Sequence, residues 1–264
     1  VRGGEPARTS IGQAIGLHEV DDPLDLKSAV ALVVDQQVQG MLFEKNDSAV
    51  LPIASITKLM TAMVVLDAQQ PMHEVLEVSD ADIDTEKNSR SRLRPGSRLN
   101  RAEMLQAALM SSENRAANAL GRYYPGGLRS FVAAMNDKAR SLGMSASSFV
   151  DPTGLSSQNV ANARDLAKMV HAASGYPLIR EYSTATGMSV DTGYRHVMFR
   201  NTNRLIDSPS WEIELQKTGY INEAGNCLVM QTRIDGRPVI IVLLDAVGRQ
   251  SRFADATRLK HWLE

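Results

Sequence analysis

The segment Ser55-Ile56-Thr57-Lys58 contains the first residues whose types and spacing could do chemistry. Residues three apart share a face of a helix, so the Ser55 hydroxyl and the Lys58 amine could meet there. A serine at a helix start also lies near free backbone N–H groups that can stabilise an oxyanion. Lysine becomes an effective base only when burial or a neighbouring cation lowers its pKa from about 10.4. The segment therefore predicts a nucleophilic serine activated by a lysine.

The S-x-x-K match is weak by itself, because about one such match is expected by chance in a chain of this length. A capping serine and a solvated lysine would explain it equally well. The surrounding sequence favours the chemical interpretation. Pro52 precedes the segment, and from Ser55 to about Gln69 the pattern is that of a helix apolar nearly all round, which is typical of a buried helix. An unpaired charge buried there is costly, so Lys58 is unlike an ordinary solvated lysine.

Ser112-Glu113-Asn114 lies between two stretches with helical periodicity. A serine and an amide two residues apart on a tight turn can point the same way, where they could bind a substrate amide or shuttle a proton. Taken alone, the same residues are better explained as the N-cap of a helix over residues 115–120.

Lys217-Thr218-Gly219 lies on a candidate strand and is followed by Tyr220. The lysine would anchor a carboxylate, the threonine would add a hydroxyl, and the glycine would let a substrate backbone approach an edge strand closely. Taken alone, this is also compatible with an ordinary strand end.

The elements around these motifs predict an α/β fold. Apolar runs over residues 29–35 and 38–44 predict a hairpin, and residues 212–220, 226–234 and 239–244 predict further strands, with a turn at Asp235-Gly236. The middle is mainly helical, with caps expected at Asn100 and Asn162, and a last helix includes Phe253. We expect a flexible N-terminal arm over residues 1–25 and a single domain over 26–264, with a helical lobe at roughly 70–165 inserted into the sheet part.

Composition excludes several classes of protein. The net charge of -1 and a pI near 6.6 argue against a nucleic-acid partner. No apolar run approaches the ~18–20 residues of a membrane-spanning helix. The five histidines show no metal-ligand spacing, so neither a metal nor a cofactor is expected. The single cysteine, Cys227, excludes an intrachain disulfide and reads as a buried strand residue.

In combination the three motifs are far more specific than each alone. Their order and their spacings, 57 residues from Ser55 to Ser112 and 105 from Ser112 to Lys217, resemble the signature of penicillin-binding proteins and serine β-lactamases. Residues 51–63, 143–155 and 216–230 resemble the low-molecular-mass D-alanyl-D-alanine peptidases. Residues 190–227 resemble the D-alanyl-D-alanine endopeptidases of the penicillin-binding protein 7 type. The resemblance extends over residues 25–264 and implies an antiparallel sheet flanked by helices.

The resemblance also implies a role for each motif residue. Ser55 would attack the carbonyl of the penultimate D-Ala, Lys58 would take its proton, and Ser112 would pass the proton to the leaving amine. Asn114 would hold the substrate amide. Glu113 departs from the Asp or Gly that is common at this position, which projects away in the family.

The third motif supplies the remaining contacts that the resemblance implies. Lys217 and Thr218 would bind the polar end of the substrate or a β-lactam carboxylate, beside Gly219. The N–H groups of Ser55 and Tyr220 would form the oxyanion hole. Arg252 matches a position that helps to bind the carboxylate, although an ordinary surface arginine is nearly as good an interpretation.

These features favour a serine DD-endopeptidase of the periplasm, whose partners are peptidoglycan stem peptides and covalent β-lactam inhibitors. A DD-carboxypeptidase is the alternative, since no motif separates the two reactions. A β-lactamase is disfavoured, because no glutamate occurs between Glu113 and Glu181 to activate water as in the enzymes with fast deacylation. A non-catalytic binder of cell-wall peptides is disfavoured because every motif residue is present. No signal peptide is visible, and we expect an exported, processed chain.

Overall fold

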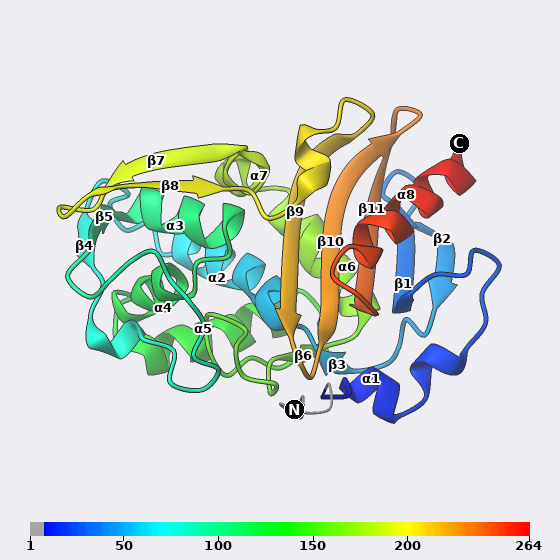
Figure 1. The fold of residues 1–264 in the computed structure, drawn as a ribbon, viewed down its shortest axis with the longest axis horizontal. Helices are drawn as coiled ribbons and strands as arrows, with labels where there is room; N and C mark the ends of the chain where they lie inside the picture. Colours follow the sequence, from blue (N-terminus) through cyan, green and yellow to red (C-terminus); the bar gives the residue numbers. More distant parts are fainter. Residues whose placement is uncertain (1–7) are drawn as a thin grey trace, which may run out of the picture.

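The computed structural model describes residues 8–264 and contains a five-stranded antiparallel sheet (Figure 1). The strand order is β2-β1-β11-β10-β9, so β9 forms an edge of the sheet. The strands are β1 (Ser28–Asp35), β2 (Gly40–Lys45), β9 (Glu212–Ile221), β10 (Gly225–Ile234) and β11 (Arg237–Ala246). Because β1 pairs with β11, the two ends of the sequence meet in one sheet, and the expected α/β class is confirmed.

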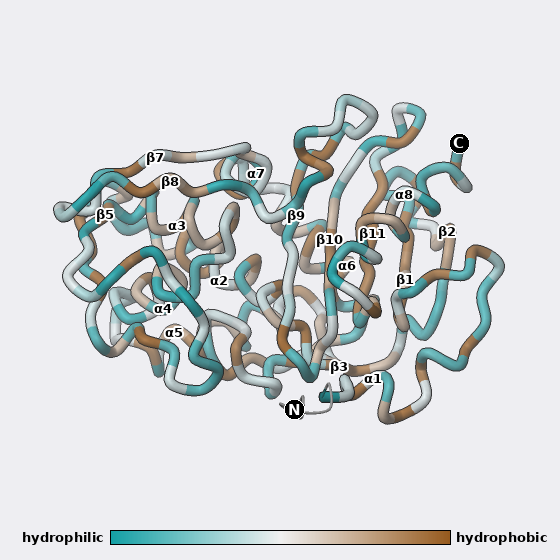
Figure 2. Tube along the Cα trace, viewed as in Figure 1, coloured by the Kyte–Doolittle hydropathy of each residue, from teal (hydrophilic) through white to brown (hydrophobic). Residues whose placement is uncertain are grey.

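Each predicted strand is present, and the predicted turns connect them. Asp235 and Gly236 both have positive φ, 49° and 75°, as a tight two-residue hairpin turn requires. The run over residues 239–244 is apolar at every position because helices cover both faces of the sheet there. Figure 2 shows the apolar residues of β11 inside the sheet and more hydrophilic residues on the outer loops.

Two separate apolar layers hold the sheet between helices. Successive strand residues point to opposite faces, so Leu32 and Val242 belong to one layer while Val33 and Ile241 belong to the other. The helix α8 (Ser251–Leu263) covers one face with Phe253, Ala256 and Leu259. The helices α2 (Thr57–Asp67) and α6 (Ala163–Ala173) contribute to the layer on the other face.

The helix α2 lies at the centre of the molecule, as its apolar sequence predicts (Figure 1). Every residue from Thr57 to Val65 is buried. Its neighbours are α3 (Arg101–Met110), α4 (Asn114–Arg122), α5 (Gly127–Ser141), α6 and α7 (Pro177–Thr184). The expected cap of α3 is confirmed: Asn100 Oδ1 accepts from the Glu103 N–H at 2.8 Å, and Glu103 accepts from the Asn100 N–H. Asn162 likewise caps α6.

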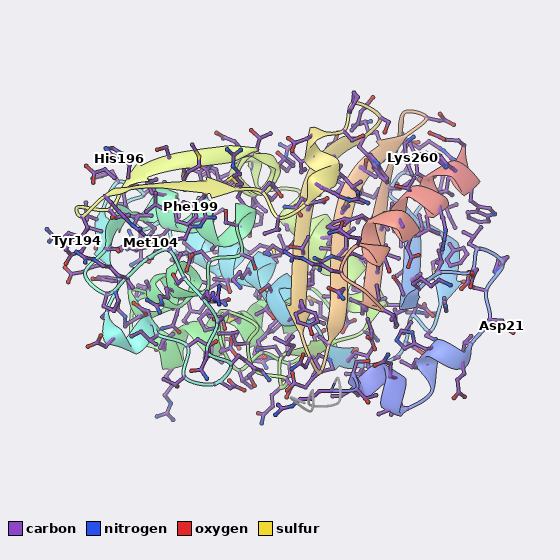
Figure 3. The ribbon with its side chains drawn as sticks, viewed as in Figure 1. Asp21, Met104, Tyr194, His196, Phe199 and Lys260 are labelled. Atoms are coloured by element: carbon purple, nitrogen blue, oxygen red, sulfur yellow. The ribbon has the colours of Figure 1, made fainter. Side chains whose placement is uncertain are left out.

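Two small hairpin-like sheets frame the helical lobe. The strands β4 (Val75–Glu77) and β5 (Arg98–Asn100) pair at one end, next to the short 3₁₀ helix η3 (Asp80–Asp82). The strands β7 (Gly187–Asp191) and β8 (His196–Arg200) lie over α3, although these residues are outside the expected lobe of 70–165. Figure 3 places Tyr194 and His196 near the far end of this hairpin and Phe199 closer to the sheet. Phe199 is buried and fastens β8 to the lobe.

The N-terminal segment differs from the expected arm over residues 1–25. Residues 8–25 form α1 (Ile11–Ala14) and the 3₁₀ helix η1 (Leu17–Glu19), while residues 1–7 lie outside the described part of the chain. The polar residues that suggested an arm instead have partners. Ser10 caps α1 and donates to Asp245 at 2.7 Å, and Lys45 forms a buried ion pair with Asp22 at 2.8 Å.

The remaining short elements complete the connections. The strands β3 (Leu51–Pro52) and β6 (Val160–Ala161) pair just before the 3₁₀ helix η2 (Ala54–Ile56), and η4 (Arg204–Asp207) precedes β9. Over residues 8–264, every helix is too short or too polar to cross a lipid bilayer.

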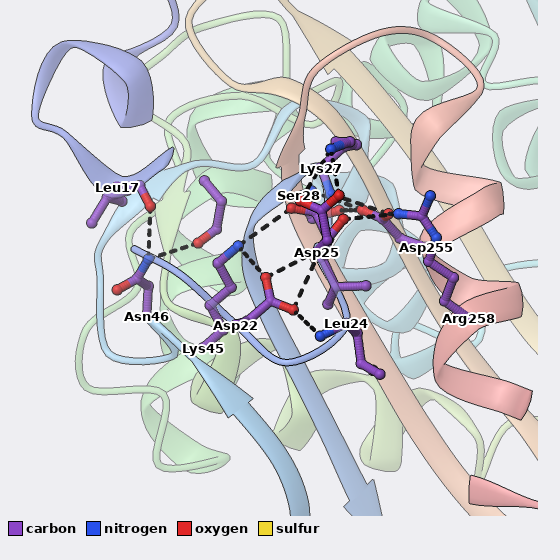
Figure 4. Close-up of polar contacts among 12 residues, drawn as sticks. Leu17, Asp22, Leu24, Asp25, Lys27, Ser28, Lys45, Asn46, Asp255 and Arg258 are labelled. Atoms are coloured by element: carbon purple, nitrogen blue, oxygen red, sulfur yellow. Dashed lines mark hydrogen bonds and ion pairs between the residues drawn. The ribbon is translucent and has the colours of Figure 1, made fainter. Parts of the chain in front are cut away.

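The carboxylate of Asp255 ties α8 to the start of β1 (Figure 4). It is fully buried and accepts hydrogen bonds from the Lys27 N–H at 3.1 Å and from the Ser28 N–H and Oγ at 2.7 Å each. The substitution Asp255→Asn keeps the shape of the side chain but replaces one accepting oxygen with an N–H₂ group, which cannot accept from the Lys27 and Ser28 donors. We expect the free energy of unfolding, measured by urea denaturation, to fall by about 2 kcal/mol.

Asp25 provides the matched control for this prediction, because its side chain is largely exposed and pairs with Lys27 on the surface. Asp25→Asn should change the free energy of unfolding by less than about 0.5 kcal/mol. Equal losses in the two variants would show that the buried Asp255 contacts do not stabilise the fold in this way.

Candidate active site

Ser55 lies in η2, immediately before α2, and two glycines pack closely against the backbone of Ala54 and Ser55. A Cβ added to Gly219 on β9 would lie 2.9 Å from the Ser55 nitrogen. A Cβ added to Gly154 would lie 1.9 Å from the Ala54 carbonyl oxygen, and Gly154 has a φ of +87° that other residues rarely adopt. Neither approach leaves room for a side chain. The edge strand therefore reaches the candidate nucleophile, a contact that differs from the close approach of a substrate backbone expected for Gly219.

Lys58 lies one turn along α2 from Ser55 and is almost fully buried. Its Nζ lies 2.7 Å from Ser55 Oγ, 2.7 Å from Asn114 Oδ1 and 2.8 Å from the Thr153 carbonyl oxygen. A neutral amine has two N–H groups and one lone pair. The carbonyl oxygens of Asn114 and Thr153 can accept the two N–H groups, which leaves the lone pair to accept the Ser55 O–H.

The electrostatic environment of Lys58 favours this neutral form. Burial lowers the pKa of Lys58 from 10.5 to about 7, although the negative charges of Asp151 and Glu113 act in the opposite direction. A base is most effective when its pKa is near the working pH. Lys58 therefore has the position and the proton affinity that are needed to take the Ser55 proton.

Asp151 organises the loop that faces Ser55 and Lys58. Its carboxylate accepts hydrogen bonds from the Thr153 N–H and Oγ1 and from the Gly154 N–H, each at 2.7 Å, and its other oxygen accepts from Ser156 and Asn159. These bonds present the Thr153 carbonyl to Lys58. Sequence reasoning missed both Asp151 and Gly154; the turn-forming run Asp-Pro-Thr-Gly was the available signal.

The second motif lies at the junction of α3 and α4. Asn114 begins α4, and its Nδ2 donates to Ser89 Oγ at 3.0 Å while its Oδ1 accepts from Lys58. Glu113 occupies the N-cap position of α4, so the segment does begin the expected helix, although no cap hydrogen bond from the Glu113 side chain is present. Ser112 is half-buried in a left-handed conformation with φ of 56°. Hydrogen bonds between the described residues connect Asn114, but not the Ser112 hydroxyl, to Lys58.

The Glu113 carboxylate is buried and accepts a hydrogen bond from Ser91 Oγ. Burial raises its pKa above the ordinary glutamate value. The side chain thus turns towards the neighbouring loop, yet its charge still reaches Lys58. The resemblance, which implied only that this position projects away, did not indicate that influence.

The third motif lies on the free edge of the sheet. Lys217 is fully buried, and its Nζ donates to the Thr218 carbonyl at 2.7 Å. Burial, followed by the positive charges of Lys58 and Arg252, lowers its pKa well below the ordinary lysine value. Thr218 Oγ1 lies 2.6 Å from Thr202 Oγ1. Tyr220 has a largely exposed ring whose hydroxyl donates to Asn222, so its side chain turns to solvent.

Arg252 lies at the start of α8 and is buried rather than on the surface, so the surface-arginine interpretation is wrong. Its guanidinium donates to the carbonyl oxygens of Gly219 at 2.9 Å and Cys227 at 3.1 Å. These bonds hold β9 and β10 beside the candidate nucleophile. Cys227 is buried as predicted, and burial raises the pKa of its thiol to about 12.

The sequence of this chain is similar to those of known peptidases. The family model of the S11 peptidases, described as D-alanyl-D-alanine carboxypeptidase, matches residues 18–248. The chain is 51% identical over 244 residues to a D-alanyl-D-alanine endopeptidase of Pseudomonas aeruginosa and 48% identical over 242 residues to one of Escherichia coli. Each match covers 91% of this chain and 78% of the relative.

A solved structure has the same fold. Penicillin-binding protein D2 of Listeria monocytogenes, in its cefotaxime-bound form, superposes with a TM-score of 0.80 at 29% identity. The match covers 91% of this chain and 98% of that protein. With a serine in contact with a buried lysine, an antiparallel sheet whose edge reaches that serine, and a family match over most of its length, the chain belongs to the S11 family of serine D-alanyl-D-alanine peptidases.

Proposed function

We propose that this protein is a DD-endopeptidase that hydrolyses D-alanyl–diaminopimelate cross-links of peptidoglycan through an acyl-enzyme on Ser55. The observation that carries the proposal is the 2.7 Å contact between Ser55 Oγ and the buried Lys58 amine. The endopeptidase specificity draws on the two relatives at 51% and 48% identity, both of which are D-alanyl-D-alanine endopeptidases.

Acylation begins when Lys58 takes the Ser55 proton and Ser55 Oγ attacks the D-alanyl carbonyl carbon. The negative oxygen of the tetrahedral intermediate accepts hydrogen bonds from the N–H groups of Ser55 and Tyr220. The bond from carbon to the leaving nitrogen then breaks, and Ser112 passes a proton to that nitrogen. Water hydrolyses the resulting ester and restores the Ser55 hydroxyl, with Lys58 as the base again.

The remaining motif residues hold the substrate. Asn114 binds a substrate amide while its Oδ1 stays fixed on Lys58. Gly219 lets β9 lie against the Ser55 backbone, so an extended peptide added along this edge strand would pass beside the nucleophile. The Thr218 hydroxyl receives the carboxylate on the leaving side. Lys217, buried on β9 itself, and Arg252, buried at the start of α8, lie beside this contact.

The alternatives have weaker support. A DD-carboxypeptidase would use the same Ser55 chemistry and agrees with the description of the family model. A β-lactamase with fast deacylation would need a water-activating glutamate, and the sequence has none between Glu113 and Glu181. A non-catalytic binder would not need the buried Lys58 amine in contact with Ser55.

The proposal also assigns the partners and the location. The substrates are peptidoglycan stem peptides, so the enzyme acts in the periplasm. β-Lactams, which resemble the D-alanyl terminus, would acylate Ser55; the Listeria relative was solved with cefotaxime bound.

The acyl-enzyme can be detected directly. Intact mass spectrometry during incubation with penicillin should show an adduct of one drug molecule that persists, because no glutamate activates water for its release. Ser55→Ala should show none. Complete hydrolysis of the drug without a lasting adduct would contradict the peptidase proposal, and unmodified protein with intact drug would contradict nucleophilic catalysis altogether.

Cross-link cleavage separates the endopeptidase from its alternative. With purified cross-linked muropeptide dimers and pentapeptide monomers as competing substrates, we expect chromatography to show conversion of dimers to monomers as the faster reaction. Both activities should disappear in Ser55→Ala. Release of free D-Ala with the dimers left intact would assign a carboxypeptidase instead.

A further inference from the structure

A polar pocket of ≈ 550 Å³ opens on the helical-lobe side of the active site. Three segments form it: the loop that follows η3, the junction between α3 and α4, and the end of β8 with the residues after it. The lining residues are Arg90, Ser91, Arg92, Ser111, Glu113, Phe199, Arg200 and Thr202.

The pocket adjoins two of the catalytic motifs. Ser111 and Glu113 flank Ser112 in the sequence, so the pocket adjoins the residue that would protonate the leaving nitrogen. Thr202 lies within hydrogen-bond distance of Thr218, 2.6 Å between the two hydroxyl oxygens. The Ser111 hydroxyl also donates to the Arg200 carbonyl at 2.6 Å, which fixes β8 against the motif. A leaving group that extends past Ser112 and Thr218 would therefore enter this pocket.

The pocket carries a local excess of positive charge. Arg90, Arg92 and Arg200 are exposed, and the ion pairs found within residues 8–264 include none of the three. Arg92 does donate to the Met198 carbonyl. Glu113 is the acidic residue of the described lining, and its buried carboxylate already accepts a hydrogen bond from Ser91 Oγ. The chain as a whole has a net charge of -1, so this positive cluster is a local feature.

Guanidinium groups suit one class of ligand above others. Their planar N–H donors match the two oxygens of a carboxylate, and charge-assisted bonds of this kind are the strong ones. Arg252 lines a different pocket, and its Nη1 already donates to the Gly219 and Cys227 carbonyl oxygens. The pocket arginines are thus a second cationic group, separate from the Lys217–Arg252 side of the strand.

We propose that Arg90, Arg92 and Arg200 form a subsite for the carboxylates of the leaving peptide. This inference rests on the proposed function, in which the leaving group is a diaminopimelate residue attached to a stem peptide. That group carries further carboxylates beyond the one next to the scissile bond. A leaving D-Ala carries a single carboxylate and ends before the pocket. The subsite therefore selects cross-linked peptides over peptides that end in D-Ala-D-Ala.

A binding experiment tests the subsite without turnover. The probe is an acidic stem peptide that ends in diaminopimelate, titrated calorimetrically into Ser55→Ala protein. Adding Arg90→Gln and Arg200→Gln should weaken binding by about tenfold per arginine. Neither side chain makes a hydrogen bond or ion pair with another described residue, so the fold should survive. A peptide whose carboxylates are amidated should bind the Ser55→Ala protein more weakly than the acidic peptide does. The loss should be similar to that caused by the two arginine substitutions.

Arg129→Gln is the matched control, because Arg129 is an exposed arginine on α5, outside the pocket lining. It should leave the affinity for the peptide unchanged. Equal affinities of the acidic and amidated peptides, or an equal loss in Arg129→Gln, would overturn the subsite.

Activity of the Ser55 enzyme gives the second readout. In Arg90→Gln/Arg200→Gln, kcat/KM for dimer cleavage should fall at least tenfold more than the rate of acylation by penicillin. A parallel fall of both rates would overturn the inference. Failure of the proposed function has a different signature: the parent enzyme would leave dimers intact, whatever the peptide-binding result.

Discussion

The burial of one amine organises this active site. Lys58 lies in a helix that is enclosed on all sides, and its Nζ contacts oxygens from three separate parts of the chain. Removing a charged ammonium from water is costly, which is why burial lowers the pKa of Lys58 to about 7. The neutral amine matches its partners one for one: two carbonyl acceptors and one hydroxyl donor. The surrounding fold has to keep α4, the Asp151 loop and α2 in register for this arrangement to exist.

The sheet contributes the other half of the site through close approach. The edge strand β9 can contact the Ser55 backbone because Gly219 has no side chain. Gly154 lies close to the Ala54–Ser55 peptide for the same reason. Arg252 fixes the same strand from behind by its bonds to Gly219 and Cys227. The arginine-lined pocket adjoins Thr218 through Thr202, and under the proposed subsite a larger leaving group would find its counter-charge there.

The sequence predicted those features that depend on local pattern. The helical spacing placed Lys58 beside Ser55, the apolar run after Ser55 predicted a buried helix, and Asp235-Gly236 predicted its hairpin. The fold class followed from strands at both ends of the chain. Asn114 and Lys217 are both far from Ser55 in the sequence. Only the order and spacing of the three motifs indicated that they belong to the same site.

The features that sequence reasoning missed depend on contacts between distant segments. Asp151 and Gly154 read as an ordinary turn until the structure placed that turn against Ser55 and Lys58. A surface position was nearly as good an interpretation of Arg252, because its hydrogen-bond partner Gly219 lies 33 positions away in the sequence. The polar segment before residue 25 suggested an arm, but the partner of Ser10 is Asp245, near the other end of the chain.

The most direct test of this account is the protonation state of Lys58 itself. Nuclear magnetic resonance of protein with ¹³C-labelled lysine, with the Lys58 signal assigned by its loss in Lys58→Met, follows the charge of the side chain as the pH is raised. We expect a titration midpoint near 7, so that the amine is largely neutral at pH 8. A midpoint near 10.5 would mean that Lys58 remains charged at working pH, and that the buried amine is not the base that activates Ser55.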